Sequence, residues 1–133
     1  MSLDITPELL EQASAGEVTD AAFVATVRKS LPYAYELIED LTGRLAGASA
    51  DGAEFADNTT PPASEAERGQ LLRALASDAI RGSLERHFGV RLAFQNCHRV
   101  AVFPASGGDE ATYRRFVSTR AQVLNQSPEL RDC

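Results

Sequence analysis

The sequence predicts an α+β domain that is predominantly helical, with about five helices and one antiparallel β-hairpin (about 90–103) before the last helix. Most apolar residues recur at the 3.6-residue spacing of amphipathic helices, and one short stretch alternates apolar and polar residues as strands do. The chain has 133 residues, 44% of them hydrophobic. We therefore expect residues 1–133 to form a single domain with a buried core.

Three helices are expected in the first third of the chain: about 7–15, from Asp20 to the break at Ser30-Leu31-Pro32, and about 31–46. Proline is tolerated in a first helical turn but not in a helix interior. Pro32 therefore predicts a new helix, with Ser30 as its N-cap.

A loop is expected over 47–63, rich in Gly, Ala and Ser at first and stiffened at its exit by Pro61-Pro62. Ser64 and Glu67 form a capping box that predicts one long helix, about 65–88. The two strands of the hairpin are expected at about 90–95 and 99–103, joined by a tight turn or by a wider bend. The last helix is expected over about 110–126.

Charge divides unevenly along a chain whose net charge is −6: residues 1–67 hold 13 of the 19 acidic residues and three of the 13 basic ones. We expect the acidic helices to face the arginine-bearing half, with a polar groove between them. The arginines are spread over a helix, a hairpin and another helix, so no nucleic-acid ligand is expected. No apolar run is long enough for a membrane span and no signal peptide begins the chain, which predicts a cytoplasmic protein.

The densest polar segment is Gln95-Asn96-Cys97-His98-Arg99, between the two strands. Residues that rigid strands position are frequent in functional sites, and a histidine exchanges protons near neutral pH. The alternative is a hairpin tip whose polar side chains bind their own backbone. Cys97 and Cys133 form no disulfide framework, and their spacing to histidine predicts no metal site.

Two further groups are candidates for a site. Asp57 and Asn58 lie in the loop between Phe55 and the double proline. Asp78, Arg81 and Glu85 recur along the long predicted helix, where they form either a solvated ion-pair ladder or one wall of a site.

Several segments carry a resemblance: Phe55-Ala-Asp57-Asn58, Arg68 to Gly82, Arg86 to Val90, Phe94 to Phe103, and Leu124 to Glu129 with the terminal Asp132-Cys133. They resemble a family of small streptomycete, actinobacterial proteins, and more distantly the lysinoalanine-forming enzymes of cinnamycin- and duramycin-type lantibiotic biosynthesis. The resemblance implies a homodimer without a cofactor that adds a peptide lysine amine to a dehydroalanine of a lanthipeptide.

The residues are expected to divide the work of such an aza-Michael addition as follows. His98 would carry the proton. The lysine would be attracted by Asp57, Asp78 or Glu85, and Arg81 or Asn96 would stabilise the developing negative charge. The peptide would be held by Asn58, Asp78, Glu85, Gln95, Asn96 and Arg99.

Two hypotheses without catalysis remain open. A dimeric module that binds a peptide or a protein fits the lack of nucleophile, metal and cofactor motifs. A small regulator that binds a metabolite would need an apolar pocket beneath the hairpin. The apolar stripes left by five short helices also predict a homodimer.

Overall fold

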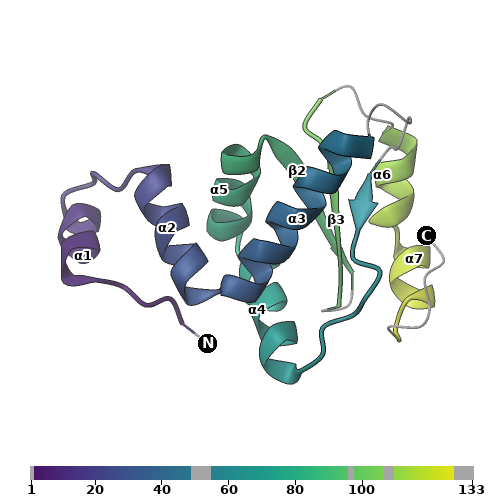
Figure 1. The fold of residues 1–133 in the computed structure, drawn as a ribbon, viewed down its shortest axis with the longest axis horizontal. Helices are drawn as coiled ribbons and strands as arrows, with labels where there is room; N and C mark the ends of the chain where they lie inside the picture. The colour runs from purple at the N-terminus through teal and green to yellow at the C-terminus, as the bar shows by residue number, and fades with distance from the viewer. Residues whose placement is uncertain (1, 49–54, 96–97, 107–109, 128–133) are drawn as a thin grey trace.

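The computed structural model describes residues 2–48, 55–95, 98–106 and 110–127 (Figure 1). The helices in these residues are α1 (Pro7–Ser14), α2 (Asp20–Ser30), α3 (Pro32–Ala48), α4 (Glu65–Leu75), α5 (Asp78–Phe88), α6 (Glu110–Phe116) and α7 (Thr119–Leu124). The strands are β1 (Ala56–Asp57), β2 (Val90–Gln95) and β3 (Arg99–Pro104). The predicted α+β class, mostly helical, is confirmed.

The predicted hairpin is present, and it forms part of a larger sheet. β2 and β3 pair in antiparallel fashion from Val90 opposite Pro104 to Gln95 opposite Arg99. β1, which lies inside the predicted loop, pairs with β3 on the other side, so the strand order is β1-β3-β2. Within the part of the chain that the structure describes, β2 is therefore an edge strand.

Two predicted helices are each divided by a serine. The predicted helix 65–88 ends at Leu75 and restarts at Asp78, because the Ser77 hydroxyl accepts a hydrogen bond from the Ile80 N–H and starts a new helix. The predicted helix 110–126 is divided in the same way by Ser118, which caps the Ala121 N–H. The apolar spacing continues through both breaks, so periodicity alone did not reveal them.

The predicted N-cap of the third helix is wrong. Ser30 is the last residue of α2, and its hydroxyl accepts a hydrogen bond from the Asp4 N–H. The first free N–H groups of α3 are instead satisfied from a distant helix: Gln70 Oε1 accepts from the N–H groups of Tyr33 and Ala34, at 2.8 and 3.2 Å. A side chain of α4 thus performs the capping that a local serine was expected to perform.

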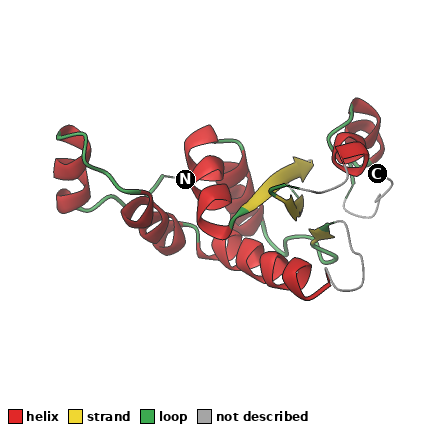
Figure 2. Cartoon of the chain, turned by 90° about the horizontal axis from the view of Figure 1, so that it is seen from above, coloured by secondary structure: helices red, strands yellow, loops and turns green. Residues whose placement is uncertain are grey.

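The sheet lies between two helical layers (Figure 2). α3, α4 and α5 pack on one face, with α2 on their outer side, while α6 lies over the other face. The first face carries the main core, which includes Ile38, Leu41, Leu71, Ile80, Leu84, Val100 and Val102. The second face carries a smaller aromatic core of Phe55, Phe103, Tyr113 and Phe116. Among the described residues, no helix is long and apolar enough to cross a bilayer.

Candidate functional site

Arg99 and Asp57 form an ion pair between neighbouring strands. Arg99 Nε donates to Asp57 Oδ2 over 2.8 Å, and the two side chains are 6% and 21% exposed. The guanidinium also lies 4.9 Å from the centre of the Phe116 ring, which adds a cation–π contact. This pair holds β1 against β3 and β3 against α6.

Asn58 extends the pairing of β1 with β3 by means of its side chain. Its Nδ2 donates to the His98 carbonyl oxygen at 2.7 Å, and its Oδ1 accepts from the Val100 N–H at 2.9 Å. Asn58 and His98 are both buried, at 2% exposure. An asparagine that satisfies two backbone groups on a neighbouring strand serves as a structural bridge.

Gln95 ties the end of the hairpin to the layer above it. Its Nε2 donates to the Phe116 carbonyl oxygen at 2.6 Å, and its Oε1 lies 3.5 Å from Arg99 Nη1. We call Asp57, Asn58, Gln95, His98 and Arg99 the hairpin cluster. The fold brings these five predicted site residues, which were candidates in two separate groups, together, and it uses their contacts to join β1, β3 and α6. Asn96 lies outside the described residues, as do Cys97 and Cys133.

The remaining predicted site residues lie on α5, away from the hairpin cluster. Arg81 pairs with Asp78 at 2.8 Å and reaches the Leu75 carbonyl oxygen at 3.4 Å. Glu85 accepts from the Leu92 N–H at 2.8 Å. The expected ladder from Asp78 through Arg81 to Glu85 is thus replaced by one ion pair and one contact to a strand.

The contact of Glu85 lies on the free edge of the sheet. β3 occupies one side of β2, and the Leu92 N–H points away from it to the α5 carboxylate. Capping an edge N–H with a charged side chain blocks further strand pairing at that point.

A groove of about 440 Å³ runs along this edge, with α5 on one side and α6 on the other. We call it the β2 groove; its lining residues are Leu75, Arg81, Glu85, Leu92, Ala93, Phe94, Tyr113 and Val117. Arg91 covers the Tyr113 ring from 3.3 Å and pairs with Glu110 at 2.7 Å, which raises the pKa of its guanidinium. Arg81 and Glu85 were predicted site residues, whereas Phe94 and Tyr113 were not, because nothing local in the sequence indicates that β2 is an edge strand.

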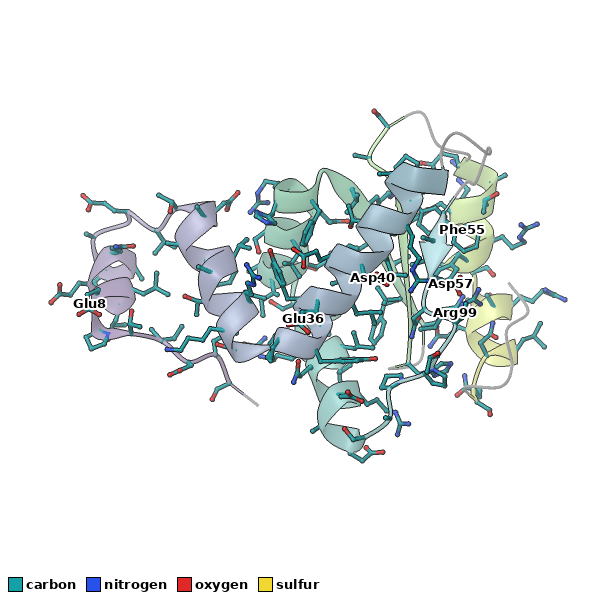
Figure 3. All side chains as sticks on the ribbon, viewed as in Figure 1. Glu8, Glu36, Asp40, Phe55, Asp57 and Arg99 are labelled. Atoms are coloured by element: carbon teal, nitrogen blue, oxygen red, sulfur yellow. The ribbon has the colours of Figure 1, made fainter. Side chains whose placement is uncertain are left out.

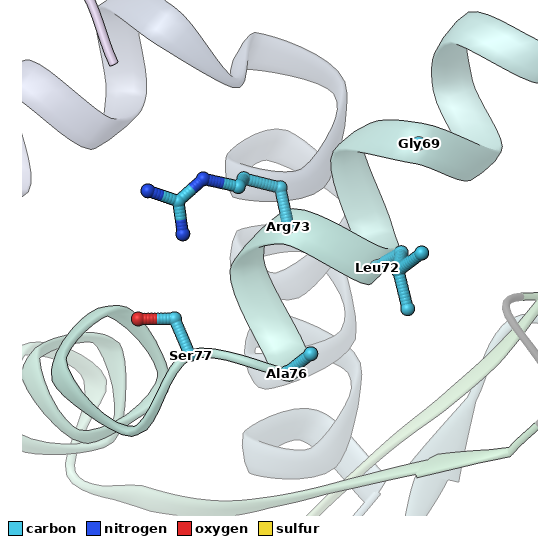
Figure 4. A pocket seen from close by; sticks show the side chains of 5 residues that line it. All are labelled: Gly69, Leu72, Arg73, Ala76 and Ser77. Carbon is cyan, nitrogen blue, oxygen red and sulfur yellow. The ribbon is translucent and has the colours of Figure 1, made fainter. Parts of the chain in front are cut away.

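A second hollow, of about 430 Å³, lies on α4 beside the α4–α5 turn (Figure 4). Gly69, Leu72, Arg73, Ala76 and Ser77 line it. The Arg73 side chain extends from α4 on the side where Ser77 lies, whereas the Leu72 side chain points to the other side of the helix (Figure 4). The α4–α5 turn therefore separates two concave surfaces, each of which has an arginine in its lining.

Besides Arg99–Asp57, an ion pair between α2 and α5 joins the two unequally charged halves. Asp20 of α2 accepts two hydrogen bonds from Arg86 of α5, and this guanidinium lowers the pKa of the Asp20 carboxyl. Other acids of α1 and α3, among them Glu8, Glu36 and Asp40, are exposed (Figure 3). Much of the negative charge of the first half therefore faces solvent rather than the arginines.

A hollow of about 390 Å³ does lie between α3 and the hairpin, where the two halves meet. Among the described residues, its lining holds no charged side chain: Thr42, Leu45, Ala46, Phe88, Gly89, Val90, Pro104, Ala105 and Ser106. It is therefore not the polar groove that the charge pattern predicted. Within the described parts of the chain, no His, Cys, Asp and Glu side chains gather as a metal-binding group.

Comparison with known proteins gives one family. A family model named KH_NucS_shadow and described as "NucS shadow ORF" matches residues 1–133, so the chain belongs to this family. No curated protein and no solved structure matches it significantly. The predicted relationship to lysinoalanine-forming enzymes is therefore wrong, because the family that spans the whole chain is a different one.

Proposed function

We propose that this member of the NucS shadow ORF family is a binding module without catalytic activity, and that it binds single-stranded nucleic acid in the β2 groove. The observation that carries the proposal is the groove itself, which follows an edge strand and has an arginine and aromatic side chains in its walls. The lysinoalanine-forming reaction was implied by the sequence resemblance alone. The hairpin-cluster residues expected to perform it are engaged in contacts between elements, so we propose no reaction.

The family name supports this choice of ligand. It carries the label KH, the name of a small module that binds single-stranded nucleic acid.

One feature of KH modules is missing. Such a module binds the nucleic-acid backbone through a Gly-x-x-Gly loop. The α4–α5 turn of this chain instead has the sequence Leu75-Ala76-Ser77-Asp78, which contains no glycine. Asp78 also places a negative charge at this turn. We therefore expect weak binding in which side chains, rather than backbone N–H groups, contact the phosphates.

Arginines that are separate in the sequence supply these contacts. Arg73 lines the hollow on α4, Arg81 lines the β2 groove, and Arg91 covers a tyrosine of the same groove. Because the arginines are spread along the sequence, no nucleic-acid ligand was expected from the sequence. In the folded chain, however, these three arginines lie around the α4–α5 turn and β2. Phe94 is half-buried in the groove and offers a surface on which a base can stack. The cytoplasm is the proposed compartment, because a single-stranded RNA is available there.

Fluorescence anisotropy with labelled single-stranded RNA and DNA oligonucleotides tests the proposal. We expect binding that weakens as salt rises. Arg73→Ala and Arg81→Ala should each reduce this salt dependence, by about 0.7 in the logarithmic slope for each phosphate that the variant no longer neutralises. Arg44→Ala on α3, whose guanidinium pairs with Asp40, is the matched control and should bind as the wild type does. No binding at low salt, or equal binding by all variants, would refute the proposal.

An extended peptide is the second candidate for the same groove. The outward N–H of Leu92 favours it, because a peptide strand that adds to a sheet edge pairs with such groups. This peptide would have to displace the Glu85 carboxylate. If the ligand is a peptide, the Glu85→Gln variant should bind unstructured peptides more tightly than the wild type does in the same assay. The Arg73→Ala variant should bind them as the wild type does.

A further inference from the structure

The segment from Ile5 to Val18, which we call the N-terminal arm, contains α1 and has little support from the rest of the described chain. It lies at one end of the molecule in both views (Figures 1 and 2), and α1 takes no part in the extensive packing between elements of the described chain. A helix as short as α1, with eight residues, is marginal in water without tertiary contacts. Leu9 is buried, but the rest of the arm has little of the packing that normally stabilises such a helix.

The arm combines exposed apolar side chains with negative charge. Ile5, Leu10 and Val18 are exposed, and Leu10 has 61% of its surface in solvent. Glu11 and Glu17 are exposed on the same segment, which has no basic residue between positions 5 and 18. A surface of this kind fits a partner that is apolar and positively charged.

The opposite end of the molecule has these properties. On α6 and in the α6–α7 turn, Arg114, Arg115 and Val117 are exposed, and Val123 of α7 is 68% exposed. We call these four residues the α6–α7 patch. The arm and the patch lie at opposite ends of the fold (Figure 1), so the arm of one molecule meets a patch only on another molecule.

We propose that the partner of the N-terminal arm is the α6–α7 patch of a second copy of this chain, in an antiparallel two-fold dimer. Two elongated molecules side by side and reversed bring each arm to the other molecule's patch. Both contacts then form at once and the assembly closes, as expected of an isologous interface. Exposed apolar residues at both ends become covered, and glutamates meet arginines. This inference does not rest on the nucleic-acid ligand, although Val117 of the patch also lines the β2 groove.

Two double variants test the charge pairing. Glu11→Arg with Glu17→Arg makes the arm positive, and Arg114→Glu with Arg115→Glu makes the patch negative. Each variant alone should be monomeric in sedimentation velocity, with a dimer dissociation constant raised by about tenfold or more, because both contacts of its dimer become repulsive. The wild type should be dimeric at the same concentration. Circular dichroism first checks that each variant keeps its helix content.

Mixing the two variants separates this proposal from a failure to fold. In the mixed pair, the positive arm meets the negative patch, while the native arm of one chain meets the native patch of the other, so the dimer should return. Glu36→Arg with Glu39→Arg, two exposed acids on α3, is the matched control and should stay dimeric. A monomeric wild type, a mixture that stays monomeric, or open chains longer than a dimer would overturn the two-fold arrangement.

Discussion

Arg99 and Asp57 face each other across two adjacent strands, with 2.8 Å between Nε and Oδ2 and little of either side chain in solvent. Forty-two residues separate them in the sequence. Their pairing joins β1, a strand of two residues, to the centre of the sheet.

Removal of one partner of this pair should be costly. Asp57→Ala leaves the buried Arg99 guanidinium without its carboxylate, and such a change typically lowers the free energy of unfolding by about 3 to 5 kcal/mol. Asp57→Ala combined with Arg99→Met should cost less than Asp57→Ala alone, because no buried charge remains. Urea unfolding measures both; a double variant less stable than Asp57→Ala would contradict the pairing.

Asn58 should be nearly as important, although it carries no charge. Asn58→Ala removes the partners of the His98 carbonyl and the Val100 N–H. Each buried group left unsatisfied costs about 1 to 3 kcal/mol, so the expected decrease in stability is about 2 to 6 kcal/mol. The exposed neighbour Thr59 is the matched control, and Thr59→Ala should be nearly neutral. Chemical unfolding of the two variants checks this, and equal stability would show that the bridge does not matter.

Replacement by alanine should change the stability of the protein in opposite directions at two glycines. Gly89 ends α5 at φ +66°, where an added Cβ meets no atom within 4 Å, so Gly89→Ala should cost about 1 to 2 kcal/mol from backbone strain alone. Gly43 lies in α3 and also has free space, so Gly43→Ala should add about 0.5 to 1 kcal/mol. Thermal unfolding compares them, and a change of the same sign in both would contradict this explanation.

Asp20 should make stability depend on pH in acid. Because Arg86 lowers the pKa of Asp20 in the folded state, the contribution of this carboxylate is complete above its ordinary value of 3.8 and is lost as the pH falls below it. Asp20→Asn should therefore lower the Tm slightly near neutral pH, and the difference should vanish in strong acid. The pair is exposed, so the effect is small. A difference that grows in acid would exclude this origin.

The chain should unfold cooperatively. Five helix starts are capped by a hydroxyl that accepts from the N–H three residues later: Thr6, Thr19, Ser64, Ser77 and Ser118. Local signals that agree with the tertiary fold are typical of sequences that specify one structure. Circular dichroism at far- and near-ultraviolet wavelengths should give coincident transitions, and separate transitions would contradict a single folding unit.

Local sequence signals were enough to predict the fold class, the hairpin, and the starts of α1, α2 and α4, because helix periodicity, strand alternation and capping are local properties. They did not reveal that Ser77 and Ser118 divide two helices, since the apolar spacing runs on through both. The residues of the hairpin cluster were predicted as candidates in two separate groups. Their meeting and their role in holding the fold together were not predictable, because both depend on the pairing of β1 with β3 and on which layer covers a strand.

What lies at the free edge of β2 follows from tertiary structure alone. β2 lies at the edge because β1 pairs with β3 on the side of β3 that faces away from β2. The residues that pair between β1 and β3 are about 45 positions apart in the sequence. The groove, its aromatic wall from α6, and the grouping of Arg73, Arg81 and Arg91 all follow from that arrangement. Such long-range pairing depends on complementary packing across the whole domain, which no window of the sequence contains.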